Sequence, residues 1–311
     1  MRRLGRTGLM VSDVGFGAWQ LGGSEAWGAM SDATACGLIH KALDLSCNLF
    51  DTAPNYGNTN SERLLGEALA GKRDQAVLVS KFGHVPGEGE NFSAEAMWKS
   101  LHDSLKRLKT DWLDVFLLHS PPPEFLNGSH PIWDAMRRAR DEGKIRFFGA
   151  SVDVASEIRT VLDTSDAQVL EILFNVFHQD ARLAFSQVRE KQTGILTKVP
   201  LDSGWLTGKY SADSQFTGVR ARWTEEQIRH RAKLVGQLDW LTTDGVPLSQ
   251  KAIGYLLAYP EVSSVIPGCR SIEQMESNLQ SARHVLSETD RARLERFWEE
   301  FTGGGSNPLP W

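Results

Sequence analysis

The stretch from residue 78 to residue 119 contains the pattern that decides the fold. It begins with the apolar run Leu78-Val79-Ser80-Lys81, continues through a segment of helical spacing over 93–108, and ends with Val115-Phe116-Leu117-Leu118-His119. Short apolar runs of this kind are typical of strands covered on both faces, as in parallel sheets. A strand, a helix and a second strand in this order predict one right-handed crossover unit.

The same alternation extends in both directions along the chain. Further apolar runs predict strands at 14–19, 48–51, 145–149, 169–174, 195–199 and 262–266. Segments of helical spacing lie between them at 31–45, 61–69, 132–141, 154–162, 181–190, 249–258 and 272–280. These units predict an α/β protein with a (β/α)8 barrel, the TIM-barrel fold. A doubly wound open sheet is the rival arrangement, because it has the same alternation.

Three segments lie outside the barrel units. Residues 1–13 predict an N-terminal β-hairpin with its turn at Thr7-Gly8, which would cover the floor of the barrel. Residues 201–241 predict a long loop and then a helix over 224–241, and residues 287–301 predict an extra C-terminal helix. A barrel of this kind takes ~250 residues. Because neither a repeat nor a linker interrupts the chain, we expect a single domain over residues 1–311.

Composition and charge argue against several classes of protein. The net charge of −5 and the isoelectric point near 5.9 leave no broad basic surface for a nucleic acid. No run approaches the ~18 apolar residues of a membrane helix, and no apolar core of a signal peptide follows the N-terminus. The cysteines have no CxxC spacing, which favours reduced thiols and argues against a metal site. We expect a cytoplasmic protein; the oligomeric state stays open.

Polar residues stand where three of the predicted strands end. Asp51, Lys81 and His119 each follow an apolar run, and Tyr56 lies in the loop after Asp51. Such a lysine or aspartate alone is most often a paired surface residue or a helix cap. The carboxyl ends of barrel strands share one rim, however, and a buried lysine and aspartate must be paired. We therefore predict that these four side chains meet.

Several motifs in this chain resemble those of the aldo-keto reductase superfamily, from about Leu4 to Leu294. The motifs are Asp51-Thr52-Ala53-Pro54-Asn55-Tyr56-Gly57, Ser80-Lys81-Phe82-Gly83, Leu113-Asp114-Val115-Phe116-Leu117-Leu118-His119-Ser120-Pro121, Gly204-Trp205-Leu206-Thr207-Gly208-Lys209-Tyr210 and Ile266-Pro267-Gly268-Cys269-Arg270-Ser271. The resemblance implies a divergent, bacterial-type member. It also implies a catalytic tetrad, namely Asp51, Tyr56, Lys81 and His119.

The chemistry of a carbonyl reduction suits this tetrad. Hydride transfer builds negative charge on the carbonyl oxygen, so an acid must supply a proton. Tyr56 would be that acid, and the Lys81 ammonium would lower its pKa from the ordinary value of ~10. Asp51 would hold Lys81, and His119 would donate to the carbonyl oxygen. We expect NADPH-dependent, reversible reduction of an aldehyde, ketone or sugar carbonyl to the alcohol.

The resemblance also implies where the cofactor lies. The chain has no GxGxxG after its first strand, which argues against a Rossmann site. NADPH (NADP+) would lie across the barrel rim instead, with Arg270 beside the 2′-phosphate and NADH as the alternative cofactor. The residues assigned to the cofactor are Trp19, Ser151, Glu171, Lys198, Leu201, Ser203, Gly204, Leu206, Lys209, Gly268, Arg270, Gln274 and Asn278.

Three positions depart from the pattern of the family. Members often have Ser-Asn after the fifth strand, a glutamine on the sixth and an aromatic residue on the seventh. This chain has Ser151-Val152, Glu171 and Lys198 instead. The resemblance implies that all three changes lie around the carboxamide and ring of the nicotinamide.

Aromatic residues near the predicted rim suggest a pocket for a small carbonyl compound or an open-chain sugar. The side chains assigned to the substrate are Trp19, Trp27, Tyr56, Phe82 and His119. One alternative is a regulatory module like the channel β subunits, which binds the cofactor with little turnover. Another is a lyase or aldolase with Lys81 as a Schiff-base amine, although Asp51 would raise the pKa that such an amine needs lowered.

Overall fold

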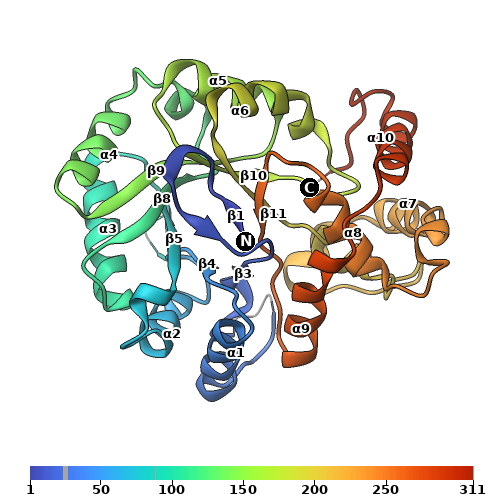
Figure 1. Ribbon diagram of the computed structural model, residues 1–311, viewed down its shortest axis with the longest axis horizontal. Coiled ribbons are helices and arrows are strands. Elements are labelled where there is room, and N and C mark those ends of the chain that lie inside the picture. Colours follow the sequence, from blue (N-terminus) through green and yellow to red (C-terminus); the bar gives the residue numbers. More distant parts are fainter. Residues whose placement is uncertain (24–26, 88, 311) are drawn as a thin grey trace.

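The computed structural model describes residues 1–23, 27–87 and 89–310, and a parallel sheet lies at its centre (Figure 1). The sheet has the strand order β12-β11-β10-β9-β8-β5-β4-β3. Its strands are β3 (Phe16–Gly17), β4 (Leu49–Asp51), β5 (Val77–Phe82), β8 (Leu113–His119), β9 (Ile145–Val152), β10 (Val169–Leu173), β11 (Gly194–Lys198) and β12 (Val262–Val265). Each predicted strand is present, and every pair of neighbours is parallel.

Backbone hydrogen bonds join the two outer strands of this sheet and close it into a barrel. Gly15 N donates to the carbonyl oxygen of Val265 at 2.8 Å, and Gly17 N donates to that of Pro267 at 3.1 Å. Parallel bridges join Val14 to Val265 and Gly17 to Gly268. The (β/α)8 barrel is therefore confirmed, and the doubly wound open sheet is excluded because an open sheet leaves these edges unpaired.

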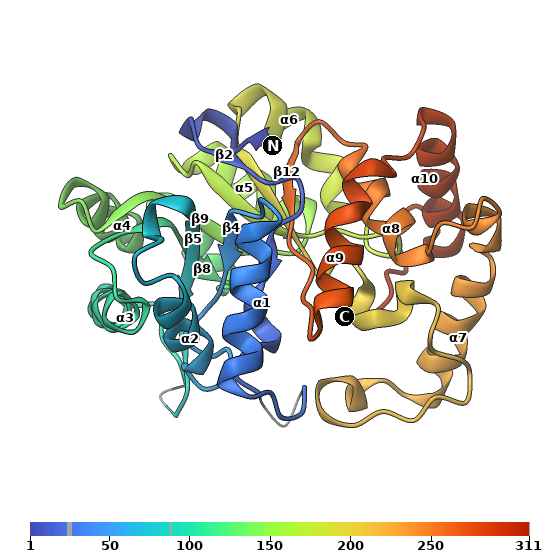
Figure 2. The same cartoon turned by 60° about the horizontal axis from the view of Figure 1, so that its bottom comes forward.

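The helices surround the barrel (Figures 1 and 2). They are α1 (Asp32–Asp44), α2 (Asn60–Ala68), α3 (Ala94–Leu108), α4 (Pro131–Asp141), α5 (Ala155–Thr164), α6 (Phe185–Lys191), α7 (Glu225–Gly236), α8 (Leu248–Leu257), α9 (Ile272–Gln280) and α10 (Glu288–Thr302). None of the helices described is long and apolar enough to cross a bilayer.

Two predicted helices differ from those in the structure. The segment predicted over 181–190 begins as a 3-10 turn at Asp180–Ala184, and α6 starts only at Phe185. The helix predicted over 224–241 ends at Gly236, and a separate 3-10 turn follows at Asp239–Thr242. Glycine is a poor helix former, and the turn after it buries Leu238 and Leu241. Periodicity alone does not show such a break.

The predicted hairpin covers the floor of the barrel. Strands β1 (Arg2–Arg3) and β2 (Met10–Val11) pair antiparallel, and Gly8 has the positive φ of 78° that their turn requires. Leu4 and Val11 are fully buried against the inward side chains at the amino ends of the barrel strands, among them Val77 and Val169. In Figure 1 the hairpin crosses the middle of the barrel.

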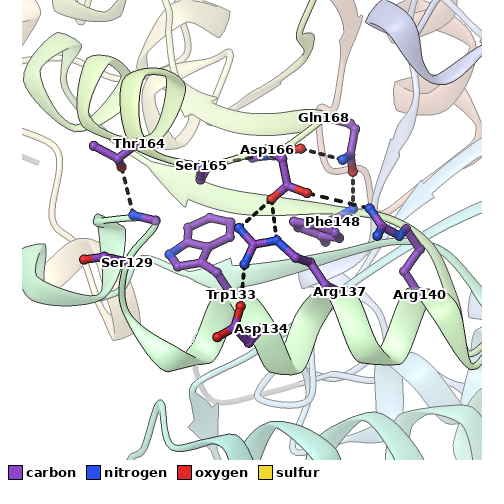
Figure 3. A network of polar contacts seen from close by, with 12 residues as sticks. Ser129, Trp133, Asp134, Arg137, Arg140, Phe148, Thr164, Ser165, Asp166 and Gln168 are labelled. Carbon is purple, nitrogen blue, oxygen red and sulfur yellow. Dashed lines mark hydrogen bonds and ion pairs between the residues drawn. The ribbon is translucent and has the colours of Figure 1, made fainter.

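Polar contacts outside the barrel fix the strands that carry the candidate site. The buried Glu62 of α2 accepts from Ser80 Oγ at 2.6 Å and from Arg107 Nε at 2.7 Å, which joins α2 and α3 to β5. Figure 3 shows a second network, in which Arg137 Nε of α4 donates to Asp166 Oδ1 at 2.9 Å. Gln168 Oε1 accepts from Phe148 N at 3.1 Å, so this network sets the register of β10 against β9.

We predict that Leu4→Ala destabilises the barrel and leaves the side chains at the carboxyl ends of its strands in place. Leu4 is fully buried, so the truncation leaves a cavity in the floor and lowers the free energy of unfolding by roughly 2–5 kcal/mol. Met10→Ala in the same hairpin is the matched control, because Met10 is 45% exposed, and its effect should stay below about 0.5 kcal/mol. Urea unfolding measures both, and equal effects would contradict the role of Leu4.

Candidate active site

The side chains inside the barrel alternate along each strand, and this alternation builds the site. In β5 the residues Val77, Val79 and Lys81 share the inner face, because successive side chains of a strand point to opposite sides. The same holds for Val115, Leu117 and His119 in β8. The inward side chains are therefore apolar near the floor and polar at the carboxyl ends of the strands.

Lys81 lies at the centre of this polar layer and is fully buried. Its Nζ donates to both carboxylate oxygens of Asp51, to the carbonyl oxygen of Thr52 at 3.1 Å and to Tyr56 Oη at 3.3 Å. Glu171 Oε2 forms an ion pair with the same Nζ at 3.1 Å. Two buried carboxylates thus surround one buried ammonium, and only one of them was predicted as its partner.

The loop after β4 brings Tyr56 over Lys81. Tyr56 N donates to the carbonyl oxygen of Ala53 at 3.1 Å, and Ser61 N donates to that of Tyr56 at 3.3 Å. The Tyr56 ring lies edge-on to His119, with their centroids 5.9 Å apart, and 6.0 Å from the ring of Trp19. The structure therefore brings together all four side chains predicted to meet at the rim.

Burial and neighbouring charges determine the protonation of the four groups. Burial raises the pKa of Tyr56 above its ordinary value, although the Lys81 ammonium acts in the opposite direction. Burial by itself would lower the pKa of Lys81, but Asp51 and Glu171 outweigh it and raise that pKa. Burial raises the pKa of Asp51, and the nearby Glu171 raises it further. The sequence suggested a lowered pKa for Tyr56; in the folded chain burial dominates, and Tyr56 is a protonated acid.

His119 is held in its neutral form. Burial lowers its pKa well below the ordinary value, and the cations Lys81 and Lys198 add to the effect, as does His84. Its Nδ1 is buried and has no hydrogen-bond partner within residues 1–23, 27–87 and 89–310. A neutral imidazole carries one N–H, so His119 can donate from one ring nitrogen only.

A chain of polar contacts continues from Glu171 across the neighbouring strands. Ser151 Oγ donates to Glu171 Oε1 at 3.2 Å, and Lys198 Nζ donates to Ser151 Oγ at 2.8 Å. Lys198 Nζ also forms an ion pair with Asp153 Oδ1 at 2.8 Å. Ser151 therefore connects Glu171 and Lys198, two of the three positions that depart from the family pattern, and it directly precedes the third, Val152.

A cavity of about 900 Å³ opens beside these groups, which is within the range of small-molecule sites. Tyr56, His119 and Asp51 line it at the reaction centre, and Trp27 also lines it. The assigned cofactor residues in its wall are Trp19, Glu171, Lys198, Leu201, Ser203, Gly204, Lys209, Gly268, Arg270, Gln274 and Asn278. Three residues of the predicted tetrad and most of the predicted cofactor residues therefore line one cavity, and the fully buried Lys81 lies behind Tyr56.

Three of the predicted binding residues lie outside its wall. Phe82 is fully buried and packs on Phe116 with centroids 5.2 Å apart, because the side chain after the inward Lys81 must point outward. Leu206 is fully buried in the core. Ser151 has no exposed surface, and its hydroxyl is bonded to Glu171 and Lys198.

Other residues of the wall were not predicted. Asn55, Ser120, Asp153 and Arg220 line the cavity. Asp153 directly follows β9, so the rule that function gathers at strand ends identifies it in hindsight. Arg220 lies in the long loop after β11, where its guanidinium stacks 4.5 Å from the centroid of Trp27, and only the fold brings these two segments together.

The donors of this wall fit a dinucleotide with phosphate groups. Lys209, Arg220 and Arg270 line the cavity, and none of them pairs with a carboxylate in the part of the chain that the structure describes. Helix α9 begins beside Arg270, where Gln274 Oε1 accepts from the Arg270 backbone N at 2.8 Å. Glu171 and Gln20 also line the cavity, and each has a side-chain oxygen of the kind that accepts from an amide.

Comparisons with known proteins agree with this geometry. Residues 13–299 match the profile of the Aldo/keto reductase family. The chain is 30% identical to L-galactose dehydrogenase of Arabidopsis thaliana, with 92% of this chain and 89% of that protein covered. It is 28% identical to the NADH-specific methylglyoxal reductase of Escherichia coli, with 95% and 97% covered. An aldo-keto reductase from Bacillus halodurans in its holo form has the same fold, with a TM-score of 0.81 at 24% identity over 95% of each chain.

We predict that His119 stays neutral across the physiological range of pH. Its ring resonances, assigned by their loss in His119→Gln, should keep their neutral positions between about pH 8 and pH 6, a range that includes the ordinary histidine pKa of ~6.5. The reason is that burial and the nearby cations disfavour the imidazolium. A titration midpoint at or above 6.5 in NMR spectra would contradict this environment.

Proposed function

The chain belongs to the aldo/keto reductase family of NAD(P)H-dependent oxidoreductases, and we propose that it reduces the carbonyl group of an aldehyde, ketone or open-chain sugar with NADPH. One observation carries the proposal: the buried Lys81 Nζ lies 3.3 Å from Tyr56 Oη, and Tyr56 lines the cavity together with His119. The reverse reaction, oxidation of the alcohol, uses the same groups.

Tyr56 acts as the general acid in this proposal. A carbonyl oxygen bound within reach of Tyr56 Oη and of His119 gains negative charge as it is reduced, and Tyr56 donates its proton to that oxygen. Lys81 then stabilises the phenolate of Tyr56 from 3.3 Å. Asp51 keeps the ammonium in place, and neutral His119 donates a hydrogen bond to the same oxygen without supplying the proton.

The nicotinamide cofactor supplies the hydride when it is bound. Glu171 would accept from its carboxamide, and Lys209 and Arg220 would hold its phosphates. We assign Arg270 to the 2′-phosphate because its guanidinium has no carboxylate partner among the described residues and donates only to the carbonyl oxygen of Ala29, at 2.8 Å. That assignment is what favours NADPH over NADH.

We predict that Tyr56→Phe abolishes turnover and preserves cofactor binding. The loss of the acid should lower kcat by a factor of at least about 100, because no other group supplies the proton. Cofactor binding should persist because the rest of the cavity wall is unchanged. NADPH absorbance, followed with panels of aldehydes and sugars, measures turnover, and tryptophan fluorescence measures binding. Tyr255→Phe is the matched control and should stay active, because that buried phenol lies outside the cavity wall and its one hydrogen bond within the described residues is to the hydroxyl of Tyr259, at 2.9 Å.

Wild-type protein that binds NADPH without reducing any of these compounds would overturn the proposal. It would favour the cofactor-binding regulatory module instead. Turnover that survives in Tyr56→Phe would overturn the role of Tyr56 alone.

We predict that Arg270→Ala weakens NADPH binding by about tenfold or more, which is the value of a lost hydrogen bond to a charged group. NADH affinity should change by less than about twofold, since NADH lacks the 2′-phosphate. Arg283→Ala is the matched control, because Arg283 is exposed, follows the same helix and lies outside the cavity wall. Fluorescence titration with both cofactors measures the result, and equal losses for the two would reject the assignment.

A further inference from the structure

We propose that Glu171 is a positioning residue for Tyr56 that acts through Lys81. Its carboxylate offsets part of the ammonium's charge, so Tyr56 remains a protonated acid further into the alkaline range, and the pH range of carbonyl reduction widens. This inference rests on the proposed function, because it takes Tyr56 as the acid. It gives Glu171 a role that an uncharged amide at the same position lacks.

Tyr56 and Glu171 both contact the ammonium of Lys81, one through a hydrogen bond and the other through an ion pair. An ammonium has three N–H donors. Those of Lys81 are directed to Asp51, to the carbonyl oxygen of Thr52 and to Tyr56 Oη, and the bond to Tyr56 is the longest. Glu171 Oε2 lies nearer, at 3.1 Å, but has no aligned N–H in the described part of the chain. A buried carboxylate in that position acts on Lys81 by its charge.

The opposite oxygen of Glu171 is anchored, which holds the carboxylate against Lys81. Oε1 accepts from Ser151 Oγ at 3.2 Å, and Ser151 and Glu171 are register partners on β9 and β10. Lys198 Nζ donates to Ser151 Oγ at 2.8 Å, so a cation balances the carboxylate from the far side. Glu171 is only 1% exposed, and a buried charge of this kind requires such compensation.

The charged groups around Tyr56 come from five strands. Asp51 faces it from β4, Lys81 from β5, Glu171 from β10 and Lys198, with its partner Asp153, from the ends of β11 and β9. His119 of β8 and His84 of β6 (His84–Val85) also lie nearby, with their rings 5.2 Å apart.

Glu171 is one of two carboxylates that oppose a Tyr56 phenolate. Burial raises the pKa of Tyr56, Lys81 lowers it, and Asp51 and Glu171 raise it further. Since Asp51 is the direct partner of Lys81, Glu171 is the position at which a charge near Tyr56 can be changed while Lys81 keeps a carboxylate partner.

The test is the titration of Tyr56 in Glu171→Gln, which keeps the shape of the side chain and removes its charge. Full-length protein is produced with a fluorinated tyrosine whose more acidic phenol titrates while the protein is folded. The 19F resonance of residue 56 is assigned by its loss in Tyr56→Phe. We expect the titration midpoint to fall by about one pH unit. Glu171→Asp, which retains the charge, should restore most of the shift.

The kinetic counterpart is the pH profile. In Glu171→Gln the kcat for reduction should begin to fall at a pH about one unit lower than in the wild type. The kcat for alcohol oxidation should begin to rise at a correspondingly lower pH. An unmoved midpoint and pH profile, with only weaker NADPH binding, would overturn the proposal and leave Glu171 as a ligand of the carboxamide.

A second variant keeps the proposal testable if Glu171→Gln does not fold. Lys198→Met removes the cation on the far side of Ser151, so the midpoint of Tyr56 should move to higher pH; an unchanged or lower midpoint would overturn the proposal. Neither NMR titration needs turnover. A wild-type protein without reductase activity would therefore reject the proposed function, whereas a normal reductase with an unmoved Tyr56 would reject only the role of Glu171.

Discussion

The ion pairs of the buried Lys81 ammonium are the constraint on which the site depends. A charged group shielded from solvent is tolerated only where an opposite charge or hydrogen bonds lie close to it. Asp51 supplies it from the neighbouring strand β4, but Glu171 supplies it from β10, which β8 and β9 separate from β5 in the sheet. The contact of Glu171 with Lys81 at 3.1 Å therefore crosses the interior of the barrel, and it exists only because the sheet is closed.

The barrel separates stability from chemistry along its axis. Near the floor, Leu4 of the hairpin belongs to one apolar cluster with inward side chains such as Val79 and Leu117. At the carboxyl ends the same strands present Lys81, His119 and Glu171, which pack poorly in an apolar core but interact with one another. Alternation along one strand produces both layers, so the register that buries the floor also aligns the rim.

Burial changes what these groups do as well as where they lie. From the sequence, Lys81 beside Tyr56 suggested a phenol with a lowered pKa. The folded protein shields that phenol from much of the solvent and places two carboxylates behind the ammonium, so the net shift of its pKa is upward. A sequence motif names the partners of a proton transfer. The balance between desolvation and charge depends on packing and on contacts between distant strands, neither of which is a local property.

The sequence by itself determined the eight strand positions, the N-terminal hairpin, and Asp51, Tyr56, Lys81 and His119 as one group, because apolar runs, turn residues and strand-end motifs are local. Only the tertiary structure decided that Arg220 meets Trp27 and that Glu171 faces Lys81. The physical reason is distance along the chain: ninety residues separate Lys81 from Glu171, and closure of the barrel brings them together.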